Sequence, residues 1–113
     1  MEDNELMAQE KEEKKAIEKK RWVLPLSKPF IFEGNTYKEL DLSGLEDLSA
    51  DDLINAEKIY QRMGGTSVSP ETTVLYGVII TAMVAQLPNE FFIKFPAKDA
   101  NRIKNMVYRF FYR

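Results

Sequence analysis

Residues 74–87 read VLYGVIITAMVAQL, the most apolar stretch of the chain. On a helical wheel the two opposite sides of this segment are both mainly apolar, but one carries small side chains and the other large ones. Gly77, Thr81 and Ala85 recur at intervals of four on one side, where another backbone could approach closely. A helix that is apolar nearly all round must be covered on both sides. The other, broader side carries Leu75, Tyr76, Ile79, Ile80, Met83 and Leu87.

That cover must come from the rest of the chain or from another chain. In a folded region of roughly 85 residues, surface outweighs interior, so full cover is hard to supply. We therefore expect either a homo-oligomer or a hydrophobic client site at this helix. The alternative is that the other elements of the same chain suffice to bury it.

Capping residues predict where the central helices begin and end. Ser69-Pro70 indicates the start of the apolar helix, because serine caps a helix and proline suits its first position. The helix before it is predicted to start at Ser49 and to stop at Gly64-Gly65, where glycine allows a left-handed C-terminal cap. Its predicted apolar stripe is Leu53, Ala56, Tyr60 and Met63.

The C-terminal part predicts a short helical segment over 90–94 and a last helix opened by Pro96. Helical spacing separates two sets of side chains on that last helix. The predicted core stripe is Ala100, Ile103, Met106, Val107 and Phe110, and the cations on another side are Lys98, Arg102, Arg109 and Arg113.

The N-terminal part predicts a β-hairpin behind a charged tail. Gly34-Asn35 is a two-residue turn signal between segments 30–33 and 36–42. Two prolines favour an extended path over 22–29. Residues 1–21 alternate Glu and Lys and form a flexible or transiently helical tail. We expect one domain over 22–113, of α+β class and mainly α, with the hairpin packed on three or four helices.

Composition excludes several classes of function. The chain has no His and no Cys, so the usual general base and the soft metal ligands are missing. We expect no catalysis, no metal and no cofactor. No run reaches the roughly 20 apolar residues of a membrane span, and the acidic N-terminus is unlike a secretory signal. We expect a cytoplasmic protein that binds no membrane.

Charge is unevenly distributed along the chain. Segment 33–57 has eight acidic residues and one lysine, whereas 96–113 has five cations and one aspartate. The two segments either attract each other within one molecule or pair with a second chain.

The basic, aromatic C-terminus superficially resembles a single-strand nucleic-acid site. With a pI of about 5.2 the chain lacks the basic balance of such modules, so we expect no nucleic-acid partner.

Residues 26–42, LSKPFIFEGNTYKELDL, resemble the opening hairpin of small tail assembly chaperones from long-tailed, Mu-like and P2-like bacteriophages. The family pattern is proline, apolar, any, apolar, acidic, glycine, then tyrosine, two residues, leucine, any, leucine. The resemblance covers about 85 residues in order and spacing. It continues through Leu48 to Glu57, Leu87-Pro88, Phe91-Phe92, Pro96 to Asp99, Ile103 to Asn105 and Phe110-Phe111.

The resemblance implies a protein that binds the tape measure protein, helps tail-tube subunits assemble around it, and is absent from the mature virion. A small domain with surplus apolar helix surface suits that task. The alternative is a structural tail or connector subunit that uses the hairpin for sheet augmentation. The partner-binding residues we predict are Tyr76, Ile80, Met83, Phe91, Phe92 and Phe111.

Overall fold

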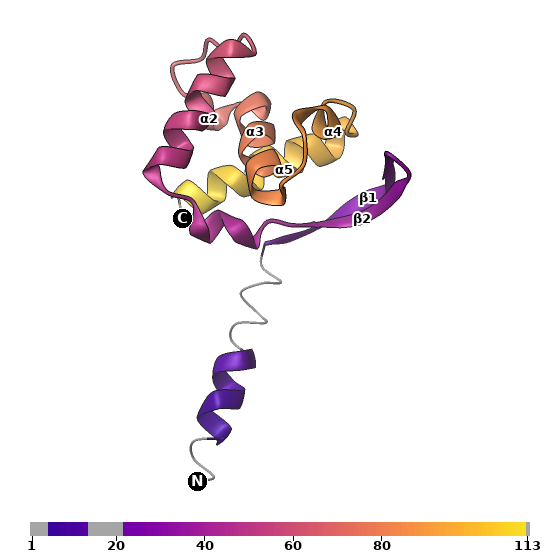
Figure 1. Cartoon of the computed structure of the whole chain (residues 1–113), viewed down its shortest axis with the longest axis vertical. Coiled ribbons are helices and arrows are strands. Elements are labelled where there is room, and N and C mark those ends of the chain that lie inside the picture. The colour runs from indigo at the N-terminus through magenta and orange to yellow at the C-terminus, as the bar shows by residue number, and fades with distance from the viewer. Residues whose placement is uncertain (1–4, 14–21, 113) are drawn as a thin grey trace.

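The computed structural model describes residues 5–13 and 22–112. From residue 22 onward the chain is α+β and mainly α, as predicted, with a two-stranded hairpin followed by helices (Figure 1). The elements, in chain order, are strands β1 (Val23–Phe32) and β2 (Asn35–Asp41), 3-10 helix η1 (Ser43–Asp47), helix α2 (Ala50–Arg62), 3-10 helix η2 (Pro70–Thr72), and helices α3 (Val74–Ala85), α4 (Asn89–Ile93) and α5 (Ala97–Tyr112).

The predicted tail is described only in part. Residues 5–13 form a helix whose side chains are all exposed. The remaining tail residues, 1–4 and 14–21, lie outside the described residues, and so does Arg113 at the other end of the chain.

The hairpin turn lies one residue earlier than predicted. Phe32 pairs with Asn35, so the two turn residues are Glu33 and Gly34. Both have positive φ angles, 49° and 81°, as a type I′ turn requires. Asn35 is instead the first residue of β2. The Gly34-Asn35 turn was the wrong choice because Glu33 accepts a left-handed conformation that is uncommon for that residue type.

A large irregularity in β1 attaches the hairpin to α5. Between the pairs Pro25 with Glu39 and Phe30 with Tyr37, residues 26–29 stand opposite a single residue of β2. The backbone N–H and the hydroxyl of Ser27 both donate to the carboxylate of Asp99, at 3.2 and 2.9 Å. This carboxylate is fully buried near the start of α5. The irregular segment is therefore held to the helix by charge-assisted hydrogen bonds.

The distal half of the hairpin packs on α4. Phe91 is fully buried. Its ring meets three others edge-on, with centroid distances of 5.0, 5.1 and 4.9 Å to Phe30, Phe32 and Tyr37. Edge-to-face contact is the favoured geometry of aromatic pairs. Ile31, which points to the other side of the strand, is exposed.

Local capping explains α2 and corrects the predicted start of α3. Ser49 and Asp52 form a capping box at the start of α2, and Gly64, with φ of 94°, follows its end. Ser69-Pro70 opens only the short η2 helix. The α3 helix begins after Thr73, whose hydroxyl accepts a hydrogen bond from the backbone N–H of Tyr76. The longer helix is therefore capped by Thr73, four residues after the predicted cap, Ser69.

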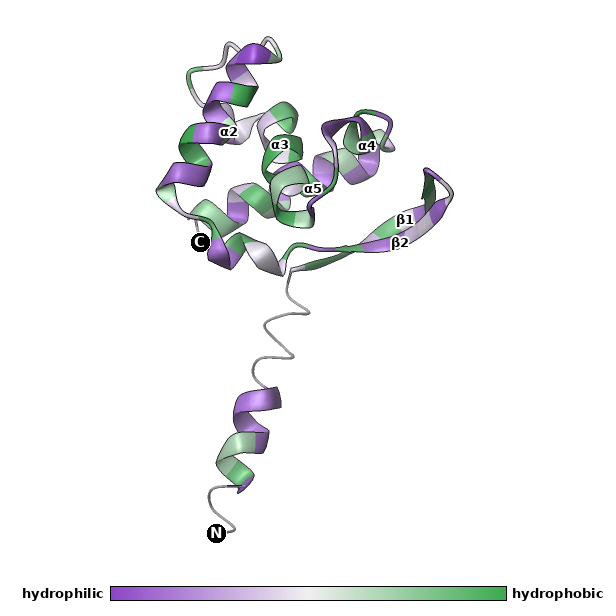
Figure 2. Ribbon diagram, viewed as in Figure 1, coloured by the Kyte–Doolittle hydropathy of each residue, from purple (hydrophilic) through white to green (hydrophobic). Residues whose placement is uncertain are grey.

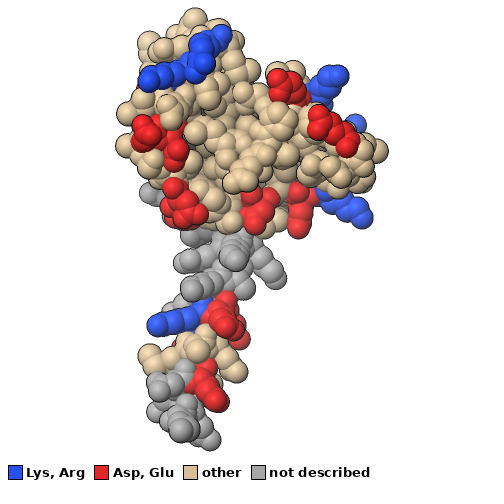
Figure 3. All heavy atoms as spheres, viewed as in Figure 1, with Lys and Arg blue, Asp and Glu red and all other residues tan. Residues whose placement is uncertain are grey.

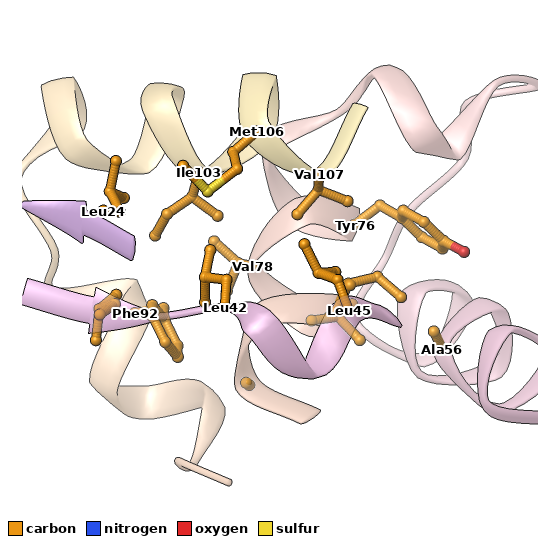
Figure 4. Packing of buried hydrophobic residues seen from close by; sticks show 14 of the residues in the cluster. Leu24, Leu42, Leu45, Ala56, Tyr76, Val78, Phe92, Ile103, Met106 and Val107 are labelled. Carbon is orange, nitrogen blue, oxygen red and sulfur yellow. The ribbon is translucent and has the colours of Figure 1, made fainter. Parts of the chain in front are cut away.

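The apolar α3 helix lies at the centre of the domain. Figure 2 shows it as almost entirely hydrophobic, and it contacts α5, α2, α4, η1 and η2. A Cβ atom on Gly77 would lie 3.0 Å from the Cα atom of Lys104 in α5. A backbone does approach the small side of α3, as predicted, but it belongs to the same chain. Figure 4 shows the facing side chains of α5, namely Ile103, Met106 and Val107.

Candidate protein-interaction surface

Most of the residues predicted to bind a partner are inaccessible in the folded chain. Tyr76, Ile80, Phe91 and Phe92 are buried, each with 5% exposure or less. Met83 and Phe111 are half-buried and pack against the core. The structure places these six residues in the interior or at its margin, so they do not form an exposed surface together.

The expectation that α3 carries surplus apolar surface is wrong. All seven residues from Tyr76 to Ala82 are buried by neighbouring elements of the same chain. The physical reason is that α5 lies directly against the small side of α3 at Gly77, while η1, η2, α2 and α4 contact other parts of the helix. The alternative, cover by the rest of the same chain, is the one that the structure shows.

A different set of apolar side chains remains exposed, where η2, the start of α3 and the end of α5 meet. Tyr108 and Tyr112 are 42% and 57% exposed, and their ring centroids are 4.8 Å apart. Val74, the first residue of α3, is 41% exposed. The η2 helix, which directly precedes Val74, contacts α5. We call Val74, Tyr108 and Tyr112 the tyrosine surface.

A buried phenol lies beside the tyrosine surface. Tyr76 is only 5% exposed, and its hydroxyl points away from the labelled core side chains in Figure 4. Burial, and then the negative charges of Glu57 and Glu71, raise the pKa of this hydroxyl. Within residues 5–13 and 22–112 it makes no hydrogen bond.

The same carboxylate of Glu71 reaches the end of α5. Partial desolvation, a hydrogen bond with Glu71 and the charge of that carboxylate raise the pKa of the Tyr112 hydroxyl. On the other side, the ring of Tyr76 contacts Tyr60 of α2, with the centroids 6.2 Å apart. Glu57 precedes Tyr60 by almost one helical turn on α2. The negative charge of Glu71 therefore acts on the hydroxyls of both Tyr76 and Tyr112.

Two other exposed apolar residues lie apart from the tyrosine surface, Ile31 on the hairpin and Ile93 at the end of α4. Val68, fully exposed, lies in the loop before η2 and lines an open hollow of about 330 Å³ together with Glu57 and Tyr60. The hydroxyl of Tyr60 accepts a hydrogen bond from the backbone N–H of Ser67, which holds this loop against α2.

Charged side chains are distributed over the folded body without forming a metal site. On the face shown in Figure 3, acidic groups are separated by uncharged surface. In the described parts of the chain, no group of three or more acidic residues is arranged to hold a metal ion. The ion pair present there joins Arg102 and Asp99 at 3.3 Å, both within α5. Whether segments 33–57 and 96–113 attract each other stays a prediction.

The sequence contained a signal for the tyrosine surface that hydrophobic periodicity did not use. Tyr108 and Tyr112 are four residues apart, so they share one side of a helix. They lie outside the predicted core stripe of α5. Aromatic residues that repeat off the core stripe are candidates for contact with a partner, since tyrosine is enriched at interfaces.

The chain matches no protein-family model, and no curated protein or solved structure matches it at a significant level. Among the residues that the structure describes, no helix has the length and apolar character needed to cross a membrane.

Proposed function

We propose that this chain is a non-catalytic protein-binding domain that acts as a tail assembly chaperone of a long-tailed bacteriophage. In this role it holds the tape measure protein in the host cytoplasm while tail-tube subunits assemble, and it leaves before the virion is complete. The observation that carries the proposal is the tyrosine surface, where two neighbouring tyrosine rings and a valine stay exposed beside a well-packed core.

Two further features support a protein partner. Tyrosine combines a large apolar ring with a polar tip, which lets it stay in water and still contribute to binding when covered. The hairpin sequence 26–42 resembles the corresponding segment of the chaperone family and does form a hairpin. The client contact that we propose is the tyrosine surface, in place of the six residues predicted from the sequence.

The proposal is tested by co-expression of the chain with the tape measure protein of the same virus. Wild-type chain is expected to increase the soluble fraction of the client and to co-purify with it. A double variant, Tyr108→Ser with Tyr112→Ser, is expected to lose most of this effect because it removes both exposed rings. Its free energy of unfolding should change by less than about 1 kcal/mol, since both side chains are exposed and outside the core.

A matched control removes exposed apolar side chains elsewhere. Ile31→Ser with Ile93→Ser changes the hairpin and α4, two sites away from the tyrosine surface. This variant should support client solubility as well as the wild type does. Equal loss in both double variants would contradict a role for the tyrosine surface, and no effect of the wild-type chain on its client would contradict the chaperone function.

The expectation of a homo-oligomer depended on α3 needing cover from a second chain. Because the chain itself covers α3, that physical argument no longer holds. We propose that a single chain provides one client surface. Light scattering of the purified protein at micromolar concentration should then give the mass of one chain, 13.1 kDa.

The hairpin favours a second candidate function, that of a structural tail or connector subunit. The described sheet has only the strands β1 and β2, so each strand has one neighbour and one unpaired edge. Such edges can pair with strands of other copies. Mass spectrometry of purified virions separates the two functions, because a structural subunit is present in many copies and a chaperone is missing.

A further inference from the structure

The outward side of α5 carries a row of uncharged side chains, spaced like those along which two packed helices touch. Successive members of the row are four, three and four residues apart, so they follow one line along the helix. All four side chains are exposed, on the side of α5 opposite its buried residues Ile103, Met106 and Val107. We call Asn101, Asn105, Tyr108 and Tyr112 the outward row. It contains both tyrosines of the tyrosine surface.

Cations lie on both sides of the outward row. Besides Arg102, which is paired with Asp99, the cations of α5 are Lys98, Lys104 and Arg109, each at least partly exposed. Each is three or four residues from a member of the row, which makes them neighbours on the helix surface. Asp99, the single acidic residue of α5, is fully buried. Glu71 of η2 reaches the row only at its end, where it is hydrogen-bonded to Tyr112.

We propose that the outward row binds an α-helix of the protein partner, packed lengthwise on α5 and carrying acidic side chains along both of its edges. Apolar side chains of that helix cover Tyr108 and Tyr112, and its carboxylates face the cations of α5. Polar side chains face the two asparagines, which restrict the register of the contact. The inference rests on the proposed function, because it names the kind of segment by which the partner binds at the tyrosine surface.

Spacing and charge select this occupant. An alternation of three and four residues matches the side chains of a second helix, whereas a strand presents every second residue. A second copy of α5 is disfavoured, because two such rows would bring like charges together. The helix over residues 5–13 of the same chain is acidic, but its large apolar residues, Leu6 and Met7, are adjacent and cannot form such a row. An acidic helix from a partner fits both properties.

The occupant is tested with a blocked peptide of three heptads. Leucine occupies the first and fourth positions of each heptad, and glutamate occupies the fifth and seventh, where like charges keep the peptide from pairing with itself. One matched peptide has lysine in place of glutamate, and another keeps the composition in scrambled order. Each is titrated into the full-length chain at low salt, and backbone amide signals are followed by NMR. Only the glutamate peptide should shift the signals of the outward row.

Two double variants test the charge on α5. Lys98→Gln with Arg109→Gln should raise the dissociation constant of the glutamate peptide about fivefold, because two surface ion pairs are lost. Lys38→Gln with Lys58→Gln changes the net charge equally at exposed positions on β2 and α2. That control should bind the peptide as tightly as the wild type does. Circular dichroism verifies that both variants are folded.

A substitution within the outward row should act in the opposite direction. Asn105→Leu replaces a polar member of the row with a side chain that packs against the leucines of the peptide, so the dissociation constant should fall several-fold. Asn55→Leu adds the same side chain at an exposed position on α2 and should leave the affinity unchanged.

Several results would overturn the inference. They are the absence of shifts at millimolar glutamate peptide, shifts confined to other parts of the chain, and equal binding of the lysine or scrambled peptide. Equal effects of the two charge variants, or of the two leucine variants, would overturn it as well.

Failure of this inference can be told apart from failure of the chaperone function. If Lys98→Gln with Arg109→Gln solubilises the client as well as the wild type does while the tyrosine double variant does not, the tyrosine surface stands and the acidic helix is wrong. If the glutamate peptide binds the outward row but the wild-type chain leaves the tape measure protein insoluble, the helix contact stands and the chaperone function is wrong.

Discussion

The α3 helix and the end of α5 show opposite relations between sequence and exposure. The α3 helix is apolar on nearly every side, yet residues 76–82 are all buried. The α5 helix is amphipathic, with a buried stripe and charged side chains such as Lys98 and Arg109 exposed, and it also exposes Tyr108 and Tyr112. The hydrophobicity of a helix therefore indicates how much apolar surface must be buried. Whether that surface is buried depends on the elements that pack against the helix.

The difference follows from position in the domain. The α3 helix contacts five other elements, so side chains on all its sides meet protein. The α5 helix is tied at its start to the hairpin by Asp99, and near its other end Tyr108 and Tyr112 are only partly covered. These exposed rings therefore lie on an amphipathic helix and not on the most apolar one.

The largest effect is expected from a charge in the middle of α3. Ile80→Asp places a carboxylate at a position with no exposure, among the apolar side chains of the core. The cost should exceed about 4 kcal/mol, so the variant is expected not to fold stably. Urea unfolding followed by circular dichroism measures it. A variant as stable as the wild type would mean that α3 is accessible to water, which would contradict the contrast between α3 and the end of α5.

Asp99→Asn should produce the next largest effect. The buried carboxylate accepts bonds from the backbone and side chain of Ser27 and pairs with Arg102. An amide keeps the shape but lacks the charge and can accept through only one oxygen, so a loss of about 2 kcal/mol is expected. Hydrogen exchange should show faster exchange of the Ser27 amide before other parts of the hairpin. Unchanged protection there would show that the hairpin is held in another way.

Gly77→Ala should destabilise the contact between α3 and α5 by about 1–2 kcal/mol. Alanine favours a helix over glycine by about 1 kcal/mol, so an exposed site would gain stability. Here the new Cβ atom would lie 3.0 Å from a backbone atom of Lys104, which cannot rotate away. Thermal unfolding of the variant determines the sign. A higher melting temperature would indicate that the two helices are further apart than described.

The smallest effect concerns alkaline pH. The pKa of Tyr76 is raised in the folded state, so above its ordinary value of 10.0 the unfolded chain loses this proton first. The unfolded state then binds fewer protons, and the free energy of unfolding falls as pH rises through that range. Tyr76→Phe should make this fall shallower than in the wild type. Urea unfolding at several pH values from 9 to 11 measures the slope, and equal slopes would contradict a perturbed phenol.

Much of the local structure could be predicted from single residues. Ser49 marked the start of α2, Gly64 followed its end, and Pro96 preceded α5, because capping chemistry acts within one helical turn. Leu40 and Leu42 alternate with the acidic Glu39 and Asp41, as expected of a strand with one side on a core, and both leucines are buried. The turn was misplaced by one residue and the start of α3 by four, because more than one residue in each segment has suitable turn or capping chemistry.

The sequence by itself determined which elements form and how much apolar surface each must hide. Those properties depend on residues that are close together along the chain, so their spacing can be taken directly from the amino-acid sequence. Only the tertiary structure decided that α5 lies on Gly77, that Asp99 holds the hairpin, and that Tyr108 and Tyr112 stay in water beside Glu71. Cover is a property of contacts between residues far apart in the chain, and no local pattern encodes which of them meet.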